Sequence, residues 1–135
     1  MTTETLKVRA PRRGLHEITS EVARVVASAQ VREGLCTVFI RHTSASLTIQ
    51  ENADPSARRD LETFLDRLVP DGASWMTHTV EGPDDMPSHI KAALTQVSLT
   101  IPIVNGRLAL GTWQGIYLWE HRNRPTTREI VVTVI

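Results

Sequence analysis

The sequence predicts an α+β domain in which strands and short helices follow one another without a regular repeat. Apolar, β-branched runs at 35–40 and 129–135 are typical of buried strands. Between them, 57–68 carries apolar residues at helical spacing with charged residues outside. The 135 residues, 41% of them hydrophobic, have the size and composition of a single domain, 1–135, with one core.

The first elements alternate between strand and helix. A short strand is predicted at 5–8. A helix follows from Ser20, because apolar residues recur at i, i+3, i+4 and i+7 from Val22, and Gly34 marks its end. The run 35–40 is then a buried strand, within which Cys36 is expected to be an inert thiol.

The stretch 41–55, RHTSASLTIQENADP, concentrates polar side chains between that strand and the next helix. If it stays extended from His42, period-two alternation places His42, Ser44 and Ser46 on one face and Leu47 on the core face. At its end, Asp54 followed by a proline predicts a capped helix start.

The second half begins with a polar loop at 75–88, where functional residues are often found. Ser88 is expected to cap a short helix whose first turn holds His89. Asn105 and Gly106 predict a hairpin turn. In 111–121, alternation separates two faces of a strand, and 129–135 is the last strand.

The charge balance excludes several classes of partner. Lysine plus arginine and aspartate plus glutamate both number 15, so no net field attracts nucleic acid or an anionic membrane.

No apolar segment reaches about 18 residues, and the first residues lack the apolar stretch of a signal peptide. We therefore expect a cytoplasmic protein.

Three of the five histidines are candidates for chemistry. His42, His78 and His89 each lie beside hydroxyls or carboxylates near the end of a regular element, whereas His16 and His121 are expected at the surface. The positive end of the helix dipole favours a neutral His89, which could ligate a metal. The same helix start could bind a phosphate, supported by Ser88 and Lys91.

Carboxylates close to these histidines suggest a divalent metal. Oxygen ligands suit Mg²⁺, whereas imidazoles suit Zn²⁺ or another borderline metal, so both identities stay open. Glu81 and Asp85, on the polar loop, are the two carboxylates expected to bind the metal. The acidic candidates are Glu51, Asp54, Glu81, Asp84, Asp85 and Glu120.

Four motifs together resemble the YjbQ-like family. They are HTSASLT at 42–48, ENADP at 51–55, EGPDDMPSHIK at 81–91 and GTWQGIYLWEHR at 111–122. The resemblance implies a β-sandwich of two mixed or antiparallel sheets flanked by short helices, and a homotrimer with sites near the subunit boundaries. It also implies a secondary thiamine-phosphate synthase, which joins a pyrimidine methyl diphosphate to a thiazole phosphate with release of pyrophosphate. The alternative is a trimeric protein that binds a metal or small ligand.

The resemblance also supplies a set of site residues. The expected ligands are a small phosphorylated molecule and a divalent metal, Mg²⁺ or Zn²⁺. The expected catalytic residues are His42, His89 and Glu120; substrate binding is expected from Ser44, Ser46, Asn52, Lys91, Thr112 and Gln114; and the candidate metal ligands are His42, His78, His89, Glu81 and Asp85.

Overall fold

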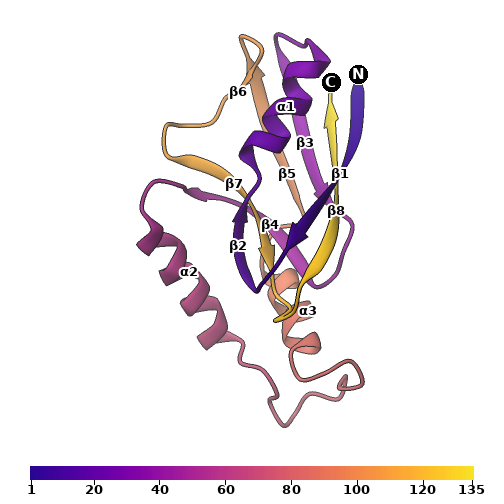
Figure 1. Cartoon of the computed structure of the whole chain (residues 1–135), viewed down its shortest axis with the longest axis vertical. Helices are drawn as coiled ribbons and strands as arrows, with labels where there is room; N and C mark the ends of the chain where they lie inside the picture. The colour runs from indigo at the N-terminus through magenta and orange to yellow at the C-terminus, as the bar shows by residue number, and fades with distance from the viewer.

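The computed structural model describes all residues, 1–135, and consists of two antiparallel sheets and three helices (Figure 1). The elements in order are β1 (Thr2–Ala10), β2 (Gly14–Glu17), α1 (Thr19–Ala29), β3 (Gly34–Ile40), β4 (Ala45–Glu51), α2 (Pro55–Leu68), α3 (Asp85–Leu94), β5 (Ser98–Val104), β6 (Arg107–Leu108), β7 (Gln114–Glu120) and β8 (Thr126–Val134). The predicted α+β class is therefore confirmed.

The two sheets pack around one main core. The five-stranded sheet has the order β1-β8-β3-β5-β6 and the three-stranded sheet the order β2-β7-β4, and every pairing is antiparallel. The main core takes Val38 and Val132 from the first sheet and Leu47 and Leu118 from the second. Helix α1 adds three buried valines. The expected sandwich flanked by helices is thus correct.

Strand β7 is buried on both faces, which explains its uninterrupted apolar run from Ile116 to Trp119. Ile116 and Leu118 face the main core, whereas Tyr117 and Trp119 pack with Leu65 of α2 in a smaller cluster. Helix α2 therefore covers the outer face of the three-stranded sheet. None of the three helices combines the length and apolar character needed to cross a membrane.

The structure corrects two predicted boundaries. Strand β4 begins at Ala45, so the chain bends at Thr43 and Ser44 and the expected extended run from His42 does not form. Helix α3 begins at Asp85, because a proline in the first turn is compatible with a helix. Ser88 consequently lies inside the helix, where its hydroxyl donates to the carbonyl of Asp84, and does not cap it. The capping role of Asp54 is confirmed, since its carboxylate accepts from the amide of Ser56.

One end of the sandwich gathers most of the expected polar residues. Helix α3 and the loop before it lie at the end opposite the two chain termini (Figure 1). The start of β4, the end of β7 and the start of β8 meet there. This end is therefore where the fold brings the candidate site together.

Candidate functional site

Three potential ligand atoms converge at the start of α3. Nε2 of His78 lies 2.7 Å from Oδ2 of Asp85, and Nε2 of His89 lies 3.0 Å from the same oxygen. One nitrogen or oxygen from each residue lies within 4.8 Å of the other two. Asp85 and His89 share one helix face because they are four residues apart, and the preceding loop supplies His78. We call these three residues the His-Asp-His cluster.

The orientation of His89 leaves a lone pair aimed into this cluster. Its Nδ1 lies 2.9 Å from the carbonyl oxygen of Thr43, which can only accept, so Nδ1 must donate. In a neutral ring, Nε2 is then an acceptor that faces the carboxylate of Asp85. Two acceptors at this separation require a proton or a cation between them. A backbone carbonyl behind the ring is also the usual arrangement of a histidine that binds metal.

Asp85 is held as an anion by its neighbours. Its Oδ1 accepts a 2.7 Å hydrogen bond from Nη1 of Arg122, which leaves Oδ2 for the two histidines. Burial disfavours the charge, but the hydrogen bond from His78 and the neighbouring His89 and Arg122 hold the pKa of Asp85 below its usual range. The carboxylate is thus ionised and fixed in direction.

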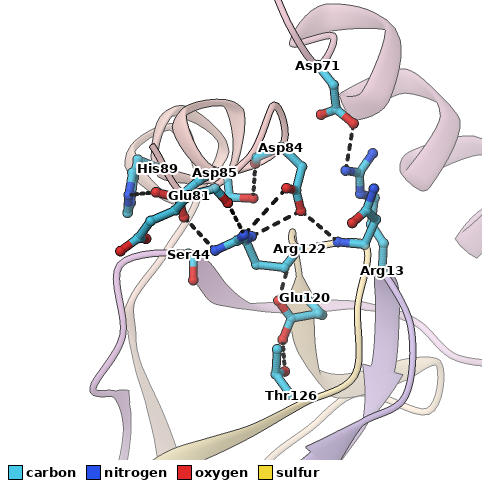
Figure 2. A network of polar contacts seen from close by, with 12 residues as sticks. Arg13, Ser44, Asp71, Glu81, Asp84, Asp85, His89, Glu120, Arg122 and Thr126 are labelled. Carbon is cyan, nitrogen blue, oxygen red and sulfur yellow. Dashed lines mark hydrogen bonds and ion pairs between the residues drawn. The ribbon is translucent and has the colours of Figure 1, made fainter. Parts of the chain in front are cut away.

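Arg122 ties the loop before α3 to the end of β7 (Figure 2). Its Nε donates to Asp84 over 3.0 Å and its Nη2 to the carbonyl of Glu81 over 2.9 Å. Burial alone would lower the pKa of Arg122, but hydrogen bonding and charge attraction from Asp84 raise it. Sequence reasoning missed Arg122, although it directly follows Glu120 and His121 in the quoted motif.

Glu120 forms a second, separate group of ion pairs in the interior. Its carboxylate accepts from Nε and Nη2 of Arg128 at 2.7 and 2.6 Å, and also from the Arg122 amide and the Thr126 hydroxyl. Nη2 of Arg128 also donates to the hydroxyl of Ser44. Both oxygens of Glu120 are therefore occupied, and its side chain is fully buried. We call Glu120, Arg128, Ser44 and His42 the Glu120 network.

His42 belongs to this network, outside the His-Asp-His cluster. Its Nε2 accepts a 2.8 Å hydrogen bond from the Glu129 amide, and its Nδ1 lies 3.4 Å from Nη1 of Arg128. Burial, followed by the charge of Arg128, lowers the pKa of His42. Because of these two contacts, both ring nitrogens face the protein. Because its pKa is lowered, the ring is neutral at neutral pH.

The structure overturns the expectation that His121 is a surface residue. It is 1% exposed, and its Nε2 lies 2.9 Å from the hydroxyl of Ser46, which is also buried. Burial, reinforced by the charge of Lys91, lowers the pKa of His121 to about 3. Residues 114–120 form the preceding strand, but the turn that follows brings His121 inward, and local sequence does not reveal this.

Lys91 and Ser88 are oriented away from the His-Asp-His cluster. Nζ of Lys91 lies 2.6 Å from the Asp66 carboxylate of α2, and the side chain is 1% exposed. The hydroxyl of Ser88 is bonded within its own helix. The expected phosphate seat at a helix start with Ser88 and Lys91 is thus not present in this arrangement.

Another part of the expected site lies at the opposite end of β4 and β7. Gln114 pairs with Glu51 at the far end of the ladder from the Ala45–Glu120 pair. Seven residues of strand span about 20 Å, so Gln114, Asn52 and the exposed Thr112 are distant from the His-Asp-His cluster within one chain. Glu81 is exposed and lies outside the three-residue group as well.

Two hollows reach the His-Asp-His cluster. One, of about 490 Å³, borders His89 and is lined by His42, Thr43, His89, Ala92, Ala93 and Val97. The other, of about 360 Å³, borders His78 and runs along the loop before α3. The side chains of His78 and His89 are 48% and 30% exposed, so a small molecule can approach them.

The family profile and the similar proteins all point to one family, and they match almost the whole length of this chain. A profile described as "UPF0047 protein YjbQ-like" matches residues 4–135. The chain is 55% identical to the UPF0047 protein sll1880 of Synechocystis, covering 97% of this chain and 89% of that protein. It is 46% identical to the UPF0047 protein YjbQ of Escherichia coli O157:H7, with 97% and 95% coverage. A YjbQ/UPF0047 crystal structure from Clostridium acetobutylicum is 38% identical, superimposes with a TM-score of 0.84 and is covered fully on both sides.

Proposed function

The chain belongs to the UPF0047 YjbQ-like family, and on this basis we propose that it is a metal-assisted transferase of the secondary thiamine-phosphate synthase type. The observation that supports a metal is the convergence of three ligand atoms within 4.8 Å of one another. The reaction breaks the bond between the pyrimidine methylene carbon and its diphosphate oxygen. The thiazole nitrogen forms the new bond to that carbon, and pyrophosphate leaves.

The donor set favours one class of metal. Two imidazoles and one carboxylate suit Zn²⁺ or a similar borderline cation, whereas Mg²⁺ prefers oxygen ligands. Three protein ligands with solvent on one side also match the usual form of a catalytic zinc site, which keeps a position open. A cation there would neutralise charge on the departing diphosphate.

The protein's own residues would set the geometry. Arg122 fixes one oxygen of Asp85 and so directs the other towards the histidines. The carbonyl of Thr43 fixes the tautomer of His89. These contacts would hold the site ready before substrate arrives, which avoids reorganisation during the reaction. The resemblance suggests that Glu120 is catalytic. In this arrangement it would instead support the His-Asp-His cluster indirectly, by accepting a hydrogen bond from the backbone amide of Arg122.

The direct test is synthesis of thiamine phosphate from the two purified substrates. We expect product with Zn²⁺-loaded protein and none above background with His89→Ala. A matched variant, Ala23→Ser on the exposed face of α1, should keep full activity. Absence of product from the loaded wild-type protein would reject the transferase proposal, even if the metal binds.

The second candidate is a protein that binds a metal or small ligand without catalysing this transfer. The imidazole-rich donor set favours it, because a diphosphate transferase more often uses Mg²⁺ held by carboxylates. Stoichiometric zinc combined with absent synthase activity would support this candidate. The metal analysis and the synthesis assay therefore separate the two.

The cytoplasmic location and the homotrimer stay predictions. The outer face of the five-stranded sheet carries apolar side chains in reach of solvent, and we propose that a second copy of the chain covers it. Leu35 and Phe39 are 46% and 44% exposed there, with Val104 on the neighbouring strand. A monomer in analytical ultracentrifugation would contradict this proposal, and Phe39→Glu should dissociate a trimer.

A further inference from the structure

The hollow beside His89 is lined mainly by carbon atoms. Ala92, Ala93 and Val97 contribute methyl groups from α3 and the segment that follows it. Nε2 of His42 accepts from the Glu129 amide, and its Nδ1 faces Arg128. Because both nitrogens point into the protein, His42 offers carbon surface to this hollow. We call it the Val97 hollow.

The two sides of the Val97 hollow differ in charge character. Ala92, Ala93 and Val97 line one side together with His42, whose ring nitrogens are turned into the protein, so the lining itself offers little that an apolar group would have to desolvate. On the other side, His89 is shared with the His-Asp-His cluster, where a cation would sit. A ligand that spans the hollow therefore meets carbon at one end and positive charge at the other.

We propose that the Val97 hollow binds an uncharged planar ring of a ligand whose anionic substituent reaches the metal at the His-Asp-His cluster. This proposal rests on the metal site proposed above, and it places the ring portion of the substrate in the Val97 hollow. The hollow has about 490 Å³, within the range of known small-molecule sites and sufficient for a single ring with a phosphate group. His42 then contributes to ring binding through its carbon surface, and metal ligation is left to the other two histidines.

Two phosphate esters of equal charge test the ring directly. Benzyl phosphate and methyl phosphate are titrated into the Zn²⁺-loaded protein by calorimetry. We expect benzyl phosphate to bind about tenfold more tightly or better, because it buries one apolar ring. Equal affinities for the two esters would overturn the proposal.

A variant that fills the Val97 hollow tests whether the ring binds there. Ala93 is exposed on α3, so Ala93→Trp should fold normally and occupy the space. We expect this variant to lose the preference for benzyl phosphate while keeping its affinity for methyl phosphate. Ala23→Trp, at an exposed position on α1, should behave as wild type. A preference unchanged in Ala93→Trp would place the ring elsewhere and contradict the proposal.

Failure of the metal site is distinguishable from failure of the ring site. Benzyl alcohol, which carries no phosphate, is added to metal-free protein labelled at its methyl groups. The resonances of Ala92 and Val97 should shift, and Ala93→Trp should abolish the shifts. If zinc does not bind but these shifts appear, the proposed metal site fails and the ring site stands; without the shifts, the ring site fails.

Discussion

The His-Asp-His cluster and the Glu120 network use similar side chains for different tasks. Each contains a carboxylate held by an arginine, and each includes a histidine. In the Glu120 network, both carboxylate oxygens are bonded internally and the side chain is fully buried. In the His-Asp-His cluster, Oδ2 of Asp85 faces two imidazoles that solvent can reach. The difference shows that available ligand atoms, more than residue type, mark the candidate site.

Arg122 connects the two groups. Its backbone amide donates to Glu120, whereas its guanidinium holds Asp84 and Asp85 (Figure 2). The interior network thereby fixes the position of the residue that orients the outer cluster. Of these two groups, the Glu120 network should therefore contribute more to the stability of the fold. The His-Asp-His cluster should contribute more to ligand binding.

The largest stability effect is expected from Glu120→Gln. The substitution leaves the buried Arg128 without its charge partner, which typically costs about 3–5 kcal/mol. Urea unfolding measures the change. The control is Glu129→Gln, whose pairing with Arg41 is exposed and should contribute about 1 kcal/mol or less. A loss below about 1 kcal/mol for Glu120→Gln would show that this network does not stabilise the fold.

Arg122→Lys should weaken metal binding more than it weakens the fold. Lysine keeps the charge but cannot reproduce the forked contacts with Asp84 and Asp85. Loss of such an orienting contact typically lowers metal affinity by about 10- to 100-fold. Competitive zinc titration measures it, with Arg41→Lys as the exposed control. Unchanged zinc affinity in a folded Arg122→Lys protein would remove Arg122 from the site.

His121→Asn should reduce the loss of stability in acid. The unfolded chain takes up a proton on this group near pH 6.5, whereas burial lowers the pKa of folded His121 to about 3. Between these values the unfolded state binds more protons, so the free energy of unfolding falls as pH decreases, by up to about 1.4 kcal/mol per pH unit.

Unfolding midpoints at pH 6 and pH 5 test this prediction. The drop over that unit should be smaller in His121→Asn by about 1 kcal/mol. His16→Asn, which changes a histidine on strand β2, should show the wild-type drop. An equal drop in both variants would mean that His121 is not buried in the neutral form.

Local patterns were sufficient for much of the fold. The cap at Asp54 and the two faces of β7 follow from nearest-neighbour chemistry, and both are confirmed. The start of α3 was predicted four residues late, since Ser88 resembles a cap, although the first helical turn accepts both Pro87 and Ser88. Family resemblance supplied the sandwich, which local patterns do not specify.

The site was harder to predict because it depends on contacts between distant segments. His89 meets a carbonyl 46 residues away, and Arg122 meets Asp85 across 37 residues. No periodicity encodes these pairs. The burial of His121 and Lys91 likewise arises from packing between elements, so neither could be distinguished from surface residues in the sequence.

Cobalt binding to two histidine variants tests most directly whether metal binding resides in the His-Asp-His cluster. Co²⁺ replaces Zn²⁺ and reports its ligands through visible absorption. Wild-type protein and His42→Asn should each bind stoichiometric cobalt with the same spectrum, whereas His89→Ala should bind none while remaining folded by circular dichroism. The contrary result, loss of cobalt in folded His42→Asn with retention in His89→Ala, would place the metal in the Glu120 network and contradict the proposed site.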